Sequence, residues 1–310
     1  MALMVPKVSI GANGRAMPVI GMGTASLSPE AMLEAIRIGY RHFDTAFVYG
    51  SEKPLGEAIA QALHLGLIKS RDELFITSKL WCTSAEKDLV VPAIKKSLGN
   101  LQLEYLDLFL IHWPLRLSKE MRQIPVPKED LLPIDIKSLW EGMEECQTMG
   151  LTKAIGVSNF SRKKLEELIS TAKIPPAVNQ VEMHPMWQQK ELVDFCKTKG
   201  IHVTAYSPLG AISTSKRNNQ TVASSLVEEI AKAHGKTSAQ VCLRWLYEQG
   251  VSMLPQSGNK KRMKENLMIF DWALSGEELN KFTQLPQHKM LRPSSFLGSH
   301  DLVLETEEGI

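Results

Sequence analysis

Two polar side chains stand out in the stretch YRHFDTAFVYG at residues 40–50. Asp44 follows the apolar Phe43 at the end of what reads as a short strand, and Tyr49 lies five residues later in the following loop. Enzymes built on a barrel of parallel strands carry their reactive groups at the C-terminal ends of those strands. The pattern therefore raises the question of which other strand ends supply partners for this carboxylate and this phenol.

Two further strand ends supply an ammonium group and an imidazole. Lys79 ends the run LFITSK at residues 74–79, and His112 ends the run LDLFLIH at residues 106–112. Taken singly, each has an ordinary structural interpretation, Lys79 as a solvated strand end and His112 as a hydrogen-bonded core histidine. Asp44 could likewise cap a turn. Together they indicate a site, because the four groups fall at equivalent positions on three successive strands.

These four groups suit the reduction of a carbonyl group. The carboxylate of Asp44 would pair with the ammonium of Lys79. That positive charge stabilises a nearby phenolate, which lowers the pKa of Tyr49 from its ordinary value of about 10 and makes it a general acid nearer neutral pH. His112 would hydrogen-bond the carbonyl oxygen. The hydride requires a nicotinamide or flavin cofactor, because no side chain supplies one.

The elements that position these groups follow from an alternation of short apolar strands and amphipathic helices. Strands are predicted at residues 18–24, 42–44, 74–79, 106–112, 152–157, 177–182, 201–206 and 251–254. Helices are predicted from residue 28, around 136–143, and at 52–64, 88–98, 161–169, 188–198, 222–233, 238–248 and 260–266. Such strands suit a parallel sheet covered on both faces. Eight such units in about 250 residues favour an α/β fold, a single (β/α)8 TIM barrel over residues 1–310.

An open, doubly wound sheet is the structural alternative. That fold is expected to carry a Gly-x-Gly-x-x-Gly turn after its first strand. The corresponding run here, GMGTAS at residues 21–26, lacks the third glycine. The barrel is therefore the preferred prediction.

Segments outside the repeat also carry information. An Asn-Gly pair at residues 13–14 predicts a β-hairpin over residues 7–19, before the first barrel strand. Irregular segments at residues 113–135 and 207–220 directly follow strands, so we expect long loops on the active face there. Residues 286–310 are predicted to form a tail that belongs to the substrate loops.

The bulk composition excludes several classes of protein. A net charge of +2 over 310 residues gives no electrostatic argument for nucleic acid or an acidic membrane. The longest apolar run, residues 106–115, contains Asp107 and His112 and is too short to span a bilayer. The chain opens without a signal-peptide pattern, so we expect a cytoplasmic protein. Its four cysteines are far apart, with no histidine at ligand spacing, which predicts free thiols and no metal site.

Motifs along nearly the whole chain resemble those of the aldo-keto reductase superfamily. The motifs are GMGT at 21–24, GYRHFDT at 39–45, YG at 49–50, SKLW at 78–81, LDL at 106–108, IHWP at 111–114, AIGVSNF at 154–160, NQVE at 179–182 and AYSPLG at 205–210. Three longer runs are similar to a plant branch that contains chalcone (polyketide) reductase, codeinone and methylecgonone reductases and deoxymugineic acid synthase. They are SKLWC at 78–82, WEGMEEC at 140–146 and VCLRWLYEQG at 241–250.

The resemblance implies a barrel closed by an N-terminal hairpin, acting as a monomeric, NADPH-dependent reductase of a small-molecule carbonyl in plant specialised metabolism. It implies that Tyr49 donates the proton while Asp44 holds Lys79, and that His112 orients the carbonyl. The implied cofactor-binding residues are Gly23, Thr24, Asp44, Ser158, Asn159, Gln180, Tyr206, Ser207, Leu209, Gln256, Ser257, Asn259, Arg262, Glu265 and Asn266. The implied substrate-pocket residues are Val48, Tyr49, Trp81, His112 and Trp113.

One region departs from the family pattern. A lysine and an aromatic residue commonly follow the last strand, but this chain has Gln256 and Gly258 there. In the family, that lysine and the arginine matched by Arg262 both contact the 2′-phosphate of NADPH. A neutral amide cannot neutralise charge, so NADH becomes a possible cofactor. Arg262, with Lys260 and Lys261 nearby, could compensate for the missing lysine. The fold alone does not select the ketone or aldehyde substrate, and a non-catalytic NADPH-binding protein on this fold is the alternative function.

Overall fold

The computed structural model describes residues 5–120, 125–210 and 221–290. Eight strands form one parallel sheet in the order β12-β11-β10-β9-β6-β5-β4-β3. A parallel bridge between Ile20 and Met253 joins the first and last strands, which closes the sheet. The predicted (β/α)8 barrel is therefore confirmed. Most of the predicted loop at 207–220 and of the tail at 286–310 lies outside the described residues.

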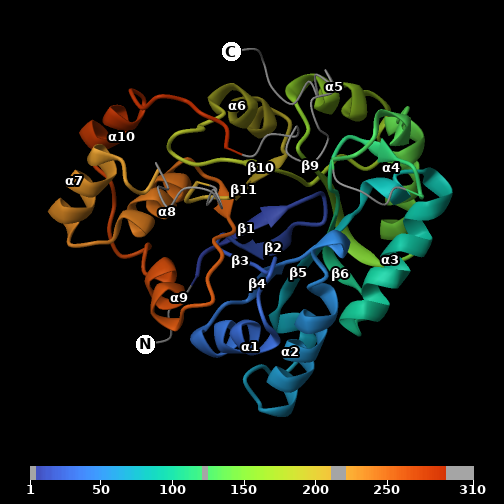
Figure 1. Cartoon of the computed structure of the whole chain (residues 1–310), viewed down its shortest axis with the longest axis horizontal. Helices are drawn as coiled ribbons and strands as arrows, with labels where there is room; N and C mark the ends of the chain where they lie inside the picture. The colour runs from blue at the N-terminus through green and yellow to red at the C-terminus, as the bar shows by residue number, and fades with distance from the viewer. Residues whose placement is uncertain (1–4, 121–124, 211–220, 291–310) are drawn as a thin grey trace.

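The helices surround the strands, and the N-terminal hairpin lies at the centre of the view in Figure 1. The barrel strands are β3 (Met22–Gly23), β4 (His42–Asp44), β5 (Phe75–Leu80), β6 (Leu106–Ile111), β9 (Thr152–Ser158), β10 (Val178–Glu182), β11 (His202–Tyr206) and β12 (Ser252–Met253). The helices are α1 (Pro29–Ile38), α2 (Glu52–His64), α3 (Lys87–Leu101), α4 (Ile136–Thr148), α5 (Arg162–Thr171), α6 (Lys190–Thr198), α7 (Ser225–His234), α8 (Ser238–Glu248), α9 (Lys260–Leu267) and α10 (Gly276–Phe282).

Local sequence signals account for where several helices begin. Ser28 accepts a hydrogen bond from the backbone of Ala31 and precedes Pro29, so α1 begins with both an N-cap and an N1 proline. Ser161 caps α5 in the same way. Strands β5 and β6 are buried along their entire length, as expected for a sheet that helices cover.

A glycine allows the first and last strands of the barrel to approach each other closely. The backbone N–H of Gly21 donates to the carbonyl of Met253, 2.9 Å away. A Cβ atom at Gly21 would lie 2.7 Å from the Leu254 side chain and 2.8 Å from the His42 ring. No larger residue fits that approach without displacing its neighbours. Strand β3 contains only two residues, fewer than the strand predicted over residues 18–24.

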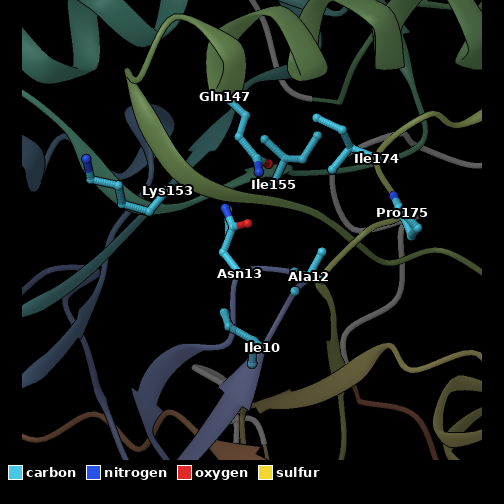
Figure 2. Close-up of a pocket in the computed structure, with 11 residues that line it drawn as sticks. Ile10, Ala12, Asn13, Gln147, Lys153, Ile155, Ile174 and Pro175 are labelled. Atoms are coloured by element: carbon cyan, nitrogen blue, oxygen red, sulfur yellow. The ribbon is translucent and has the colours of Figure 1, made fainter.

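The predicted hairpin is confirmed as β1 (Lys7–Ile10) paired with β2 (Arg15–Pro18). Ile10 and Met17 pack against residues near the start of the barrel strands, among them Phe75. Figure 2 shows a small hollow at this end, with the side chains of Asn13 and Gln147 on opposite sides of it. Its volume is about 10 Å³, room for about one water molecule. A hollow of this size cannot hold a carbonyl substrate.

Two short strands and one α-helix were not predicted. The Pro-rich segment at 113–135 contains an antiparallel pair, β7 (Arg116–Leu117) with β8 (Leu131–Leu132). Helix α10 lies in a part of the chain for which the sequence analysis proposed no element. Helix α7 begins at Ser225, three residues later than predicted. Helices α2 and α8 have the predicted bounds, and the other predicted helices are present with ends that differ by a few residues.

Candidate active site

A cleft of about 400 Å³ opens at the C-terminal ends of the barrel strands. Its lining contains fourteen of the residues predicted for the site and two that were not predicted, Ala25 and Leu254. The fourteen are Gly23, Thr24, Asp44, Val48, Tyr49, Trp81, His112, Trp113, Ser158, Asn159, Gln180, Tyr206, Ser207 and Gln256. Residues from strands β3, β4, β9, β10 and β11, and from the loops after β5, β6 and β12, therefore converge on one cavity.

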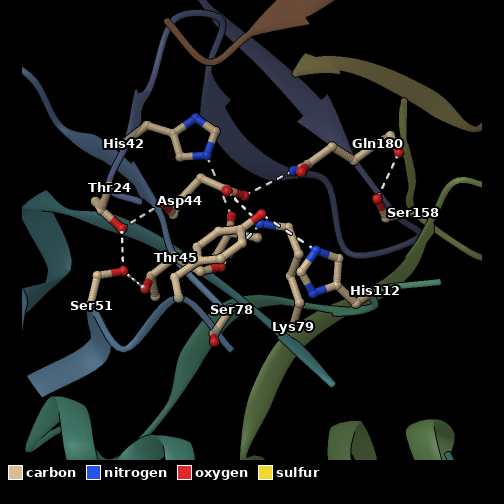
Figure 3. A network of polar contacts seen from close by, with 12 residues as sticks. Thr24, His42, Asp44, Thr45, Ser51, Ser78, Lys79, His112, Ser158 and Gln180 are labelled. Carbon is tan, nitrogen blue, oxygen red and sulfur yellow. Dashed lines mark hydrogen bonds and ion pairs between the residues drawn. The ribbon is translucent and has the colours of Figure 1, made fainter. Parts of the chain in front are cut away.

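Lys79 lies beneath this cleft, at 1% exposure, and is held by two acceptors. Its ammonium donates to the Asp44 carboxylate and to the Thr45 carbonyl, the latter at 3.0 Å (Figure 3). Burial lowers the pKa of Lys79, but the charges of Asp44 and Tyr49 outweigh burial and raise the pKa above its ordinary value. Lys79 is therefore a fixed cation at neutral pH.

Asp44 is held from a second side by Gln180. The Gln180 amide donates to the other oxygen of the Asp44 carboxylate at 2.8 Å. Each carboxylate oxygen thus faces one donor, which orients the carboxylate toward Lys79. The sequence analysis expected Gln180 to act on the cofactor and did not foresee this contact with Asp44.

Tyr49 is carried on the short 3-10 helix Phe47–Tyr49, directly after the strand that ends at Asp44. The Lys79 ammonium lies 5.0 Å from the centre of its ring, and its hydroxyl is 3.3 Å from His112 Nε2. The prediction that the pKa of Tyr49 falls below 10 is wrong for the protein alone. Lys79 does lower this pKa, but burial of the phenol outweighs that effect and raises it. Tyr49 consequently holds its proton at neutral pH.

His112 completes the group. Burial and the nearby Lys79 charge both lower its pKa well below the ordinary value of 6.5, so the imidazole is neutral at neutral pH. Its ring meets those of Tyr49 and Trp81 edge to face, with centroid distances of 5.4 and 5.3 Å. A neutral imidazole can share a hydrogen bond with an uncharged oxygen without adding a competing positive charge.

A second polar cluster lies across the cleft. Asn159, in a left-handed conformation at φ 63°, donates to the His112 carbonyl at 2.9 Å and accepts from the Tyr206 hydroxyl at 2.8 Å. The Ser158 hydroxyl donates to the Gln180 backbone carbonyl at 2.8 Å. These contacts connect strands β6, β9, β10 and β11, so the amide side chains lie on a rigid base.

The remaining predicted residues lie at and after the end of β12. Gln256 donates its amide to the Ala25 carbonyl. Asn259 caps α9 by accepting from the backbone of Arg262 at 3.1 Å. Lys260 pairs with Glu34 at 2.5 Å, and so it is less available as a substitute cation. The exposed Arg262 makes no ion pair with any residue in the ranges that the structure describes.

Besides Lys79, Asn259 and Arg262, four more of the predicted residues are outside the cleft lining. Asn266 is buried, and Leu209 packs against the core. Glu265 is 3.8 Å from Lys261. Ser257 contacts Asn259 through its hydroxyl.

The donor set is compatible with a dinucleotide that carries phosphate. The N-terminus of α9 presents unpaired backbone N–H groups and the positive end of the helix dipole, with Arg262 exposed beside them, which favours an anion. At the other end, the cleft offers the Ser158 hydroxyl and the Asn159 amide as hydrogen-bonding groups for a carboxamide. The residues that the structure describes contain no cluster of ligands for a metal ion and no helix able to cross a membrane.

The sequence analysis missed the groups that support the site from behind. Ser51 and Glu52 open helix α2 and are buried at 3% and 2% exposure. The sequence marked them only as the start of a helix. Their burial is a property of the packed fold, so the sequence carried no signal for this role.

Comparisons with known proteins agree with this geometry. The Aldo/keto reductase family matches residues 20–286. D-galacturonate reductase of Fragaria ananassa is 60% identical over 98% of each chain. NADPH-dependent codeinone reductase 1-4 of Papaver somniferum is 53% identical over 98% of this chain and 96% of that one. The crystal structure of a Bombyx mori aldo-keto reductase in complex with NADP matches 94% of this chain and 97% of that one, with a TM-score of 0.86 and 34% identity.

Proposed function

The chain belongs to the aldo/keto reductase family, and from this premise we propose that it reduces the carbonyl group of a small ketone or aldehyde with NADPH. The observation that supports this most strongly is the contact of Asp44, Lys79, Tyr49 and His112 at one end of one cleft. When bound, NADPH supplies the hydride that no side chain can provide.

The chain itself supplies the proton and the electrostatic stabilisation. Tyr49 donates its hydroxyl proton to the substrate oxygen as negative charge develops there. Lys79, 5.0 Å from the Tyr49 ring centre, stabilises the phenolate that remains. Asp44 holds Lys79 in place and keeps it charged, since an unpaired ammonium at this depth would tend to lose its proton.

His112 and the aromatic walls orient the substrate. The neutral His112 ring lies beside the Tyr49 hydroxyl, so both can hydrogen-bond one carbonyl oxygen. Trp81, Trp113 and Val48 line the same cleft and shape its apolar side. Such walls exclude water, which strengthens the polar interactions inside.

We assign the opposite side of the cleft to the cofactor. Ser158, Asn159 and Gln180 are proposed to hold the carboxamide, and the Tyr206 ring to stack on the nicotinamide. The path beyond the nicotinamide is lined by Gly23, Thr24, Ser207 and Leu209. The adenosine end is proposed to contact Gln256, Ser257, Asn259, Arg262, Glu265 and Asn266.

The substrate belongs to plant specialised metabolism in this proposal. Two similar plant proteins are named for a sugar acid and for an alkaloid ketone, so their names do not select one compound. We further propose a monomeric, cytoplasmic enzyme, which light scattering after gel filtration and cell fractionation would test. The non-catalytic alternative has no supporting observation, because all four reactive groups are present and in contact.

An initial-rate screen of plant ketones and aldehydes, followed by nicotinamide absorbance, tests the proposal. We expect at least one carbonyl compound to be reduced with NADPH, and the screen is repeated with NADH. Binding of NADPH without turnover of any member of a broad panel would contradict the proposal and favour a binding protein.

A further inference from the structure

The residue directly before helix α2 makes contacts that the proposed reaction does not yet use. Ser51 is the N-cap residue of α2 by position, and serine favours that position because its hydroxyl accepts from the first turn. Here it makes no such bond. Its hydroxyl lies 2.8 Å from the hydroxyl of Thr45 and 3.0 Å from that of Thr24 (Figure 3).

Counting protons fixes the direction of this chain of hydroxyls. The Thr24 hydroxyl donates its one proton to the Asp44 backbone carbonyl at 2.9 Å. Thr24 must therefore accept from Ser51, and Ser51, having donated its own proton, must accept from Thr45. The result is one continuous chain in which each bond strengthens the next, running from Thr45 through Ser51 and Thr24 to the carbonyl of Asp44.

Both ends of this chain are residues that hold the Lys79 ammonium. Thr45 accepts from Lys79 through its backbone carbonyl at 3.0 Å, and Asp44 accepts through its carboxylate. Tyr49 lies two residues before Ser51 in the same turn. The chain thus connects the two acceptors of Lys79 with the segment that carries the Tyr49 phenol.

Glu52, the residue after Ser51, is held in place by two hydrogen bonds. Glu52 accepts from the Ser78 hydroxyl at 2.7 Å with one carboxylate oxygen and from the Asn100 amide at 2.8 Å with the other. Ser78 directly precedes Lys79 on β5. Ser51 and Glu52 are therefore hydrogen-bonded to the segments that carry Asp44 and Lys79. The three residues of the hydroxyl chain, Thr24, Thr45 and Ser51, are at most 3% exposed.

We propose that Ser51 is a positioning residue for carbonyl reduction, holding Thr24, Asp44 and Thr45 in one hydroxyl chain that keeps Lys79 and Tyr49 in reacting geometry. This role rests on the proposed reductase function. Ser51 does not line the cleft, so it acts through its neighbours and does not itself contact the substrate.

Four variants separate positioning from general stability: Ser51→Ala, Thr45→Val, their combination, and Thr45→Ser as the matched control that keeps the hydroxyl. Thr45→Val leaves the carbonyl that contacts Lys79 in place. We expect Ser51→Ala and Thr45→Val each to lower kcat by about tenfold to a hundredfold, because small displacements of reacting groups have effects of that size. We expect KM to change by less than about threefold, since the lost interactions act on the transition state.

The double variant and the matched control show whether Ser51 and Thr45 act together to position the reacting groups. In the double variant, kcat should fall little further than in either single variant, because one broken bond already interrupts the chain. Thr45→Ser should retain kcat within about twofold. Losses that multiply in the double variant, or wild-type kcat in Ser51→Ala, would overturn the role.

A measurement without cofactor distinguishes failure of this role from failure of the proposed function. In protein labelled with ¹³C at tyrosine Cζ, Tyr49→Phe identifies the Tyr49 signal among those of the five tyrosines. We expect this signal to shift in Ser51→Ala and Thr45→Val but not in Thr45→Ser. An unmoved signal contradicts the positioning role even if the wild-type protein proves to reduce no carbonyl in the screen.

Discussion

Replacing Asp44 by asparagine tests how the site keeps a buried cation. The two oxygens of Asp44 face two donors, Lys79 and Gln180. Asparagine offers one oxygen and one NH₂ group, so one of these donors would face another donor. Removing one partner of a buried ion pair costs about 3–5 kcal/mol. Because Lys79 keeps the Thr45 carbonyl, we expect the lower end, about 3 kcal/mol of unfolding free energy.

Equilibrium urea unfolding at pH 7.5 measures this loss under conditions in which the pair is fully formed. The pKa of Lys79 in the folded protein lies above its ordinary value of 10.5. A raised pKa means that the stabilisation is complete below 10.5 and is lost only as pH rises through the folded value. We also expect kcat/KM to fall by about a hundredfold or more, since the lysine is no longer held beside the phenol.

The matched control removes the buried charge as well. In the double variant Asp44→Asn/Lys79→Met, most of the lost stability should return, because no unpaired ammonium remains, while activity stays absent. Unchanged stability in Asp44→Asn, or a double variant no more stable than Asp44→Asn, would refute the reasoning that the pair exists to hold a buried charge.

Three further predictions follow from other parts of the molecule. Gln256→Lys should raise affinity for NADPH relative to NADH by about tenfold, measured by fluorescence titration, and no gain would show that this position does not set the preference. The lowered pKa of His112 predicts that kcat/KM for reduction shows no inflection near pH 6.5, and an acid limb there that is absent from His112→Gln would contradict a neutral imidazole. Asp107 is buried and pairs with Arg15 of the hairpin and with Arg71, so Asp107→Ala should lower the free energy of unfolding in urea by about 3 kcal/mol. A loss below about 1 kcal/mol would show that the two ion pairs contribute little to stability.

Much of the barrel could be predicted from the sequence because its periodic pattern is strong. The ends of α2 and α8 fall where the apolar spacing and flanking residues placed them. The antiparallel pair β7–β8 could not be predicted, because two-residue strands within a proline-rich segment leave no periodic signal. Helix α10 had a usable signal that was overlooked, since Ser275 and Glu278 form a capping box at its start.

The site was predictable in its residues but not in all of its electrostatics. Strand ends place Asp44, Lys79 and His112 at one mouth once the barrel is recognised. The pKa of Tyr49, however, depends on how deeply its phenol is buried, and burial outweighs the effect of Lys79. Burial depth is a property of the packed fold, so the residue types alone gave the wrong direction.

Contacts between side chains that are distant in the sequence could not be predicted from it either. Gln180 contacts Asp44 although the two residues lie 136 positions apart. Ser51 bonds Thr24 and Thr45 instead of capping its helix. Such pairings follow from the register of neighbouring strands and from the rotamers that packing allows, which local spacing does not determine.

The most direct test of the central proposal is turnover and NADPH binding in Tyr49→Phe. This variant removes one hydroxyl and leaves the ring beside Lys79 and His112. With a carbonyl substrate from the screen, we predict that kcat falls by about a thousandfold or more, since the proton donor is lost, while the Kd for NADPH stays within about threefold of wild type. Wild-type turnover in Tyr49→Phe would contradict the assignment of Tyr49 as the proton donor and, with it, the proposed mechanism.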